Sequence, residues 1–135
     1  MITGIIQARM GATRLPGKTL KEIEGASLLG WTIRAVRACS LLDEVIVATT
    51  VLADDDPIVS EAEAYGARVY RGDPDDVLAR YVGVGREYGL DIIVRVSGDS
   101  PLFSPWVCAG VVDAYRTAGC DYVSNATDET FPYGT

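Results

Sequence analysis

The stretch Ile92-Ile93-Val94-Arg95-Val96-Ser97-Gly98-Asp99-Ser100-Pro101 decides the fold class of this chain. Four of its first five residues are apolar and β-branched, and these five form the clearest strand in the sequence. The residues from Ser97 onward carry the Gly and Pro that are typical of a loop. A helical pattern lies on each side, from about Asp76 to Gly89 before it and from Ser104-Pro105 to Gly119 after it. A strand between two helices predicts a parallel sheet.

The same alternation continues towards both ends of the chain. We expect further strands over residues 2–8, 45–48, 69–70 and 122–124. One more helix follows the first strand, and another begins at Asp56-Pro57, read as N-cap and N1, and ends at Gly66. Helical spacing predicts that the four inward faces are made by Leu29, Ile33 and Val36; by Ile58, Ala62 and Tyr65; by Leu78, Tyr81, Val82 and Tyr88; and by Val107, Val111 and Ala114. The fold class is therefore α/β, with three layers and a mostly parallel sheet covered by helices on both faces.

Length and composition predict one globular domain. The chain has 135 residues, of which 48% are apolar and 23% charged, and this is ordinary for a soluble protein. No apolar run approaches the roughly 18 to 20 residues of a membrane span, and the chain begins without a basic, cleavable leader. We therefore expect a cytoplasmic protein with no membrane partner.

The net charge, the absence of histidine and the spacing of the cysteines limit the kinds of reaction and partner that this chain can have. The net charge is −7 and the basic residues form no block, which argues against a nucleic-acid partner. The chain has no histidine, which excludes Ser-His-Asp triads and HExxH zinc sites. Its three cysteines have no CxxC spacing. Carboxylates, Arg, Lys, hydroxyls and backbone amides remain, and they suit metal-assisted phosphoryl or nucleotidyl transfer.

The loop after the first strand is the first candidate site. Residues 8–18 (ARMGATRLPGK) hold three cations, two glycines and a hydroxyl directly after a strand. Ligands of open parallel sheets bind at the carboxyl ends of the strands, where such a loop can cradle phosphates. Residues 12–19 (ATRLPGKT) also fit a permissive P-loop pattern. Three features argue against a P-loop. The match starts four residues past the expected strand end, and it lacks Gly at a position where a P-loop usually has one. The helix that should follow Lys18 would also reach Gly25 after about two turns.

Two later loops hold acidic candidates. Asp99 follows a strand in a Gly-containing loop, where it could hold Mg²⁺ or simply form an Asx-turn. Asp75 and Asp76 could cap a helix, while Arg80 could point back to the site or pair with Asp76. The run of residues 54–56 (DDD) is better explained as turn and cap than as a metal site.

These motifs resemble a known family. Residues 5–18 (IIQARMGATRLPGK) are similar to the opening signature of the cytidylyltransferases, which include CMP-Kdo synthetase and the spore coat polysaccharide biosynthesis protein F group, the latter being the nearer match. The similarity continues in order through residues 43–49 (DEVIVAT), 71–72 (RG), 76–81 (DVLARY), 94–102 (VRVSGDSPL) and 121–125 (DYVSN). It covers essentially the whole chain.

The resemblance implies a nucleotide-diphospho-sugar transferase fold, which is Rossmann-like. It also implies transfer of CMP from CTP to a sugar or sugar acid, with release of pyrophosphate, for cell-surface or spore-coat polysaccharide. The implied catalytic residues are Arg9, Arg14, Lys18 and Asp99, with Mg²⁺ held by Asp99. The implied nucleotide-binding residues are Ala8, Arg9, Gly11, Thr13, Arg14, Lys18, Arg80, Ser97 and Gly98.

The chain departs from the family in two respects. Members commonly have Ser at the position of Ala12, which leaves open whether Thr13 supplies that hydroxyl. Members are also much longer, so we expect residues 1–135 to be one nucleotide-binding domain, the N-terminal part of a longer member. A non-catalytic nucleotide-binding fragment therefore stays as an alternative. Apolar surface left by a missing half could favour a homodimer.

Overall fold

The computed structural model describes residues 1–11 and 15–126. Twelve elements follow one another along the chain: β1 (Ile2–Gln7), the short 3-10 helix η1 (Lys18–Leu20), β2 (Glu22–Ile23), β3 (Ala26–Ser27), α1 (Leu28–Arg37), β4 (Glu44–Thr50), the 3-10 helix η2 (Ala53–Asp55), α2 (Asp56–Ala64), β5 (Arg68–Gly72), α3 (Val77–Tyr88), β6 (Ile92–Ser97) and α4 (Pro105–Ala118). The predicted α/β alternation is confirmed.

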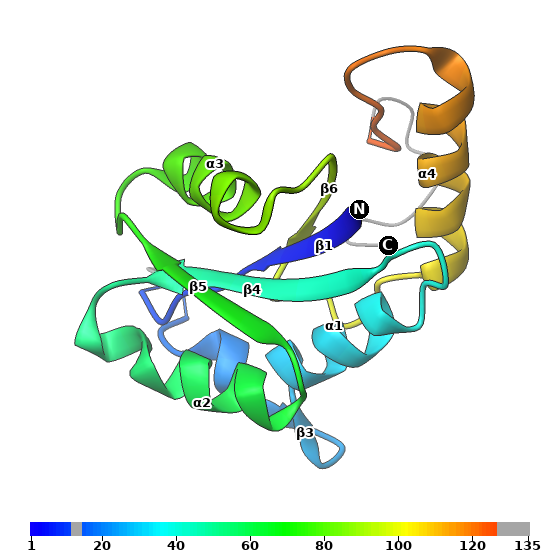
Figure 1. Cartoon of the computed structure of the whole chain (residues 1–135). Helices are drawn as coiled ribbons and strands as arrows, with labels where there is room; N and C mark the ends of the chain where they lie inside the picture. Colours follow the sequence, from blue (N-terminus) through cyan, green and yellow to red (C-terminus); the bar gives the residue numbers. More distant parts are fainter. Residues whose placement is uncertain (12–14, 127–135) are drawn as a thin grey trace.

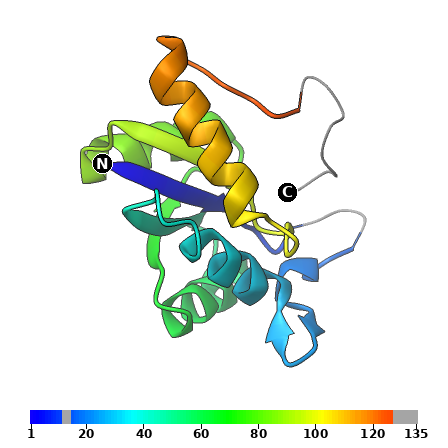
Figure 2. The ribbon, with the colours of Figure 1, turned by 90° about the vertical axis from the view of Figure 1, so that its right-hand side faces the viewer.

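The main sheet has four parallel strands in the order β5-β4-β1-β6. In Figure 1, α3 covers one face of this sheet and α1 and α2 cover the other. The fourth helix, α4, packs Cys108 and Val112 against Ile2 and Ile92, beside the edge strand β6. Figure 2 shows the full length of α4 on that side of the molecule. The three-layer architecture expected from the sequence is therefore present.

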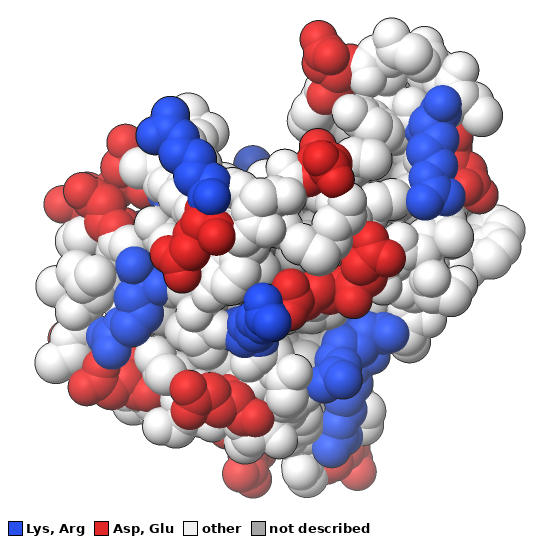
Figure 3. Space-filling model, in the orientation of Figure 1, with Lys and Arg blue, Asp and Glu red and all other residues white. Residues whose placement is uncertain are grey.

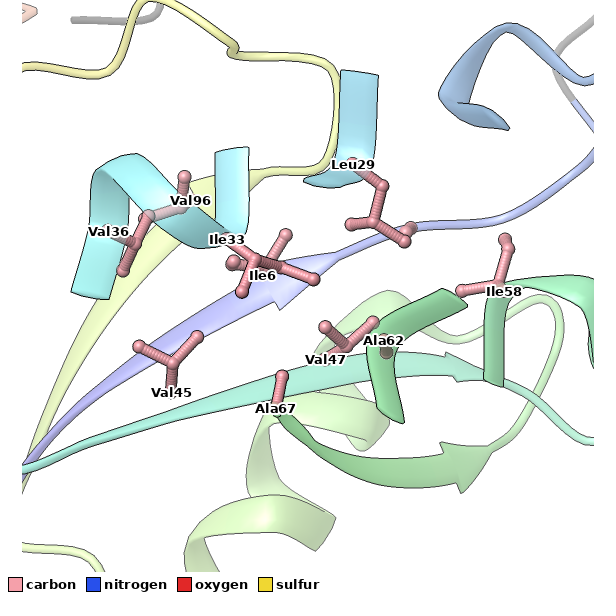
Figure 4. Packing of buried hydrophobic residues seen from close by; sticks show 11 residues of the cluster. Ile6, Leu29, Ile33, Val36, Val45, Val47, Ile58, Ala62, Ala67 and Val96 are labelled. Carbon is pink, nitrogen blue, oxygen red and sulfur yellow. The ribbon is translucent and has the colours of Figure 1, made fainter. Parts of the chain in front are cut away.

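Alternation along the strands builds the two sides of the core. Ile6 of β1 faces α1 and α2, where it joins Leu29, Ile33, Val36, Val45, Val47, Ile58, Ala62, Ala67 and Val96 (Figure 4). Its neighbour Ile5 faces α3 with Ile46, Ala48 and Val84. Consecutive side chains of a strand point to opposite faces, so a central parallel strand must be apolar at both. Ile5 and Ile6, the apolar pair of this strand, accordingly lie buried on opposite faces.

Several boundaries and faces differ from the sequence prediction. Residues 122–124 were predicted as a strand, but they are not one, and no described strand pairs with the outer edge of β6. A small antiparallel hairpin, β2–β3, precedes α1 and was not predicted. It is too short to show a period-2 pattern.

Two helices match the predicted inward face only in part: Tyr81 and Tyr88 of α3 and Val107 of α4 pack inward as predicted, but other positions do not. Leu78 and Val82 of α3 are 71% and 41% exposed, and the buried positions are Arg80 and Val84. In α4, Ala114 is exposed and the buried stripe is Val107, Cys108 and Val112. The sequence pattern allowed two overlapping apolar stripes, and contact with the sheet selected one of them.

The helix ends follow local chemistry. Gly66, Gly89 and Gly119 each adopt a positive φ just after α2, α3 and α4, as expected for C-terminal glycines. Ser104 caps α4 as predicted, accepting from the Val107 amide at 3.3 Å. The N-cap of α2 is Asp55 rather than Asp56, and Asp56 lies in the first turn.

On the face shown in Figure 3, Lys and Arg side chains lie among Asp and Glu rather than in one patch. Within the described residues, no helix is both long and apolar enough to cross a membrane.

Candidate functional site at the carboxyl edge of the sheet

An ion pair joins the first loop to the loop after β6. The Lys18 ammonium donates to the Asp99 carboxylate, although 81 positions separate them in the chain. The Ser97 hydroxyl donates to the other Asp99 oxygen. The side chains of Lys18 and Asp99 are 37% and 32% exposed, so both remain within reach of a ligand. The structure thus brings together three of the residues selected from the sequence.

Backbone contacts hold the two loops in place. The Gly98 amide donates to the Gln7 carbonyl at 2.8 Å, and the Gly17 amide donates to the Met10 carbonyl at 3.1 Å. Gly17 has a φ of 67°, a left-handed conformation that glycine adopts without strain. This turn directs Lys18 towards Asp99 from the start of η1. The site is therefore formed by backbone geometry as well as by charge.

Except for Arg80, the remaining sequence candidates belong to the same two loops. Ala8 is buried, and its amide donates to the Ala48 carbonyl at 3.1 Å, while Arg9 and Gly11 are exposed. Thr13 and Arg14 lie outside the described residues. The described residues of this stretch, 15–19, do not support the P-loop alternative, because Lys18 opens a three-residue 3-10 helix that leads into β2 rather than an α-helix.

Arg80 lies apart from this ion pair, beside the end of β5. Its side chain is 1% exposed, and Nη1 donates to the Asp73 carbonyl and, at 3.2 Å, to that of Pro74. No salt bridge in the described part of the chain joins it to Asp76. Asp76 instead caps α3 by accepting from the Ala79 amide at 2.8 Å. In this segment, Asp76 thus has the capping role expected from the sequence, and Arg80 is buried rather than paired with Asp76.

Sequence reasoning missed the role of Asp55. It is 3% exposed, and it accepts from the Met10 amide at 2.7 Å and from the Thr50 hydroxyl. It therefore connects the end of β4 to the first loop. The run of three aspartates at residues 54–56 was visible in the sequence, but only the fold shows that the Asp55 carboxylate points inward.

We expect Asp55→Ala to lower the free energy of unfolding by about 1–3 kcal/mol, because it leaves buried donors without an acceptor. The Met10 amide should also lose protection from hydrogen exchange. Asp54→Ala is the matched control, since Asp54 is exposed, and its effect should stay within about 0.5 kcal/mol. Equal destabilisation by the two substitutions would contradict the anchoring role.

The ion pair also predicts a pH dependence. The hydrogen bond from Lys18, and next that from Ser97, hold the pKa of Asp99 below its ordinary value, against an opposing effect of burial. A lowered pKa stabilises the folded state above the unfolded pKa of about 3.9, and this stabilisation is lost as pH falls through the folded pKa. The difference in unfolding free energy between the wild type and Asp99→Asn should therefore be constant above about pH 5 and disappear at lower pH. Chemical denaturation across pH measures it, and a difference that closes near neutrality would contradict the assignment.

Comparison with known proteins identifies the family. A family model described as cytidylyltransferase matches residues 3–132. The chain belongs to the cytidylyltransferase family. It is 35% identical over 122 residues to the spore coat polysaccharide biosynthesis protein SpsF of Bacillus subtilis, covering 87% of this chain and 51% of that protein. It is 39% identical over 103 residues to the 3-deoxy-manno-octulosonate cytidylyltransferase of Bdellovibrio bacteriovorus, covering 75% of this chain and 40% of that one.

Solved structures agree with this assignment to the cytidylyltransferases. A cytidylyltransferase from Leptospira borgpetersenii superposes with a TM-score of 0.92 at 33% identity, covering 98% of this chain and 57% of that one. A CMP:2-keto-3-deoxy-manno-octonic acid synthetase solved with CTP gives a TM-score of 0.77 at 25% identity, with 88% and 48% covered. The chain spans about half the length of the curated relatives that it matches.

Proposed function

We propose that this cytidylyltransferase chain binds CTP at the carboxyl edge of the sheet and transfers CMP to a hydroxyl of a sugar acid, releasing pyrophosphate. The observation that carries the proposal is the Lys18–Asp99 pair, which puts a cation and a carboxylate beside a glycine-bearing loop. The names of two relatives support a sugar-acid acceptor and a polysaccharide product. The acceptor and the pathway rest on those relatives alone.

The donor set fits a magnesium ion. Asp99 supplies carboxylate oxygens and Ser97 a hydroxyl oxygen, and Mg²⁺ prefers hard oxygen ligands. The described residues contain no group of three or more His, Cys, Asp or Glu that could hold a metal by themselves. Mg²⁺ commonly takes one or two carboxylates and completes its shell with water and substrate phosphates. Asp99 with Ser97 beside it would therefore hold the ion together with the nucleotide.

Each residue has a distinct task in this proposal. Bound Mg²⁺ would neutralise charge on the phosphates. Lys18, released from Asp99 by the ion, would pair with the phosphates. Exposed Arg9 would add charge from the same loop, to which Arg14 also belongs in the sequence. In the reaction, the acceptor oxygen bonds to the α-phosphorus while the bond from that phosphorus to the pyrophosphate oxygen breaks, and the proton of the acceptor hydroxyl passes to water. The amides around Gly98 and Gly17 fix the loops that carry these groups.

A direct test combines binding with turnover. Calorimetry with CTP, ATP, GTP and UTP, each with and without Mg²⁺, should show a preference for CTP that Mg²⁺ strengthens. Incubation with CTP, Mg²⁺ and 3-deoxy-manno-octulosonate or another sugar acid should release pyrophosphate. Binding without pyrophosphate release for any sugar acid would favour the non-catalytic module, an alternative motivated by the length of the chain. Absence of nucleotide binding would refute both.

A further inference from the structure

Two buried thiols meet where α4 packs against the rest of the molecule. Cys39 follows the C-terminal end of α1, and Cys108 lies near the start of α4. Their side chains are 2% and 5% exposed, and both belong to one packed cluster with Ile2 and Val112. Neither cysteine is among the residues of the proposed nucleotide site. The two thiols are therefore available for chemistry of their own.

The two sulfur atoms interact directly. Burial, and after it the hydrogen bond and the charge of the Cys39 side chain, raise the pKa of the Cys108 thiol to about 12. Hydrogen bonding between two thiols requires them to lie side by side, in agreement with their shared cluster. Both cysteines are free thiols in the structure. Because the thiolate is the reactive form, a raised pKa makes Cys108 slow to react rather than inert.

The third cysteine lies elsewhere and serves as an internal comparison. Cys120 is exposed and follows Gly119, the C-cap of α4. At a helical rise of 1.5 Å per residue, Cys108 and Cys120 are roughly 18 Å apart, whereas a disulfide needs Cα atoms within about 7 Å. Within one chain, Cys108 can therefore pair with Cys39 and not with Cys120.

We propose that Cys39 and Cys108 form an oxidation site, at which hydrogen peroxide generates an intramolecular disulfide that fastens α4 to the end of α1. One sulfur attacks a peroxide oxygen, the O–O bond breaks, and a sulfenic acid and water form. The other sulfur then attacks the sulfenic sulfur, the S–S bond forms, and the hydroxyl leaves as water with the second thiol proton. Two thiols and one peroxide thus give one disulfide and two waters. This inference does not depend on the proposed function.

The position of this bond determines its effect. It would close a long loop of chain that contains β4, α2, β5, α3 and β6, together with the loop that carries Asp99. Closing a long loop restricts the unfolded chain and so favours the folded one. The helix that gains the link, α4, lies beside the edge strand β6 and is packed there through the cluster of Cys39 and Cys108. Oxidation should therefore stabilise the whole fold.

The wild-type chain provides the first test. After treatment with hydrogen peroxide, the remaining thiols are alkylated in denaturant, and a digest made without reductant is analysed by mass spectrometry. We expect a peptide that joins Cys39 to Cys108, lighter by two hydrogen atoms than its two parts and separated by dithiothreitol. Exposed Cys120 reports whether the peroxide dose was sufficient. If Cys120 is oxidised while Cys39 and Cys108 are both recovered as alkylated thiols, or as sulfinic acids, the proposal is overturned.

Thermal unfolding in a Cys120→Ser background provides the second test, since that change prevents links between chains. Peroxide should raise the midpoint of unfolding by roughly 5–15 °C, the effect of closing a long loop. Cys39→Ala in the same background is the matched control, and its midpoint should shift by less than about 2 °C on treatment. Comparing each variant before and after peroxide also separates the disulfide from methionine oxidation. Equal shifts in the two variants would overturn the link between α1 and α4.

Discussion

Asp99→Ala should abolish the strengthening of CTP binding by Mg²⁺ and lower any pyrophosphate release by at least about 100-fold, the scale of one charged group at a phosphoryl-transfer site. Asp99 is the carboxylate that pairs with Lys18 at the end of β6, and it is partly exposed to a ligand. Its removal also frees Lys18, so binding of CTP without Mg²⁺ should be unchanged or tighter. Misfolding would weaken CTP binding both with and without Mg²⁺. Loss of metal binding alone should remove only the gain in affinity that Mg²⁺ gives.

Two comparisons sharpen this experiment. Asp113→Ala removes an equally charged residue on the exposed side of α4, where Asp113 pairs with Arg116 at 3.8 Å, and it should leave both affinities unchanged. Lys18→Met should weaken CTP binding both with and without Mg²⁺. If Mg²⁺ still strengthens CTP binding in Asp99→Ala, the metal is held elsewhere and the role given to Asp99 is wrong.

Gly98→Ala is expected to destabilise the fold by about 1–3 kcal/mol, the cost of forcing a methyl group into a packed site. An added Cβ would lie 2.8 Å from the Gln7 carbonyl oxygen and 2.9 Å from Ala8 Cβ. These neighbours belong to the end of β1 and the start of the first loop, and backbone atoms cannot move aside as a flexible side chain does. We therefore expect weaker CTP binding together with the loss of stability, measured by denaturation and calorimetry.

Gly110→Ala provides the control within the same chain. Gly110 lies inside α4, and apart from the helix's own backbone no described residue lies within 4 Å of an added Cβ there. Alanine is a better helix former than glycine, so this change should stabilise the chain by about 0.5–1 kcal/mol. If both glycine substitutions had the same sign, close packing between the loops at Gly98 would not be the reason for its glycine.

Local patterns were sufficient for most of the fold. The apolar run at Val45 predicted a buried strand and the run at Ile92 predicted a strand, and glycines after the helices predicted their ends. Ser104-Pro105 predicted the start of α4 for the same reason, since capping depends on residues a few positions apart. The segment 122–124 failed because a strand requires a neighbouring strand, which its own residues cannot specify.

The candidate site, like the fold, was predicted from the sequence only in part. The sequence by itself determined the fold class, the family and the candidate loops, because strands, turns and glycine-bearing motifs are encoded by neighbouring residues. Only the tertiary structure joined Lys18 to Asp99, turned Asp55 inward to hold Met10, and buried Arg80 with two donors unpaired. These contacts link residues brought together by the parallel sheet, or depend on which face of a helix meets it. A one-dimensional pattern does not state which strand ends meet or how each helix is rotated.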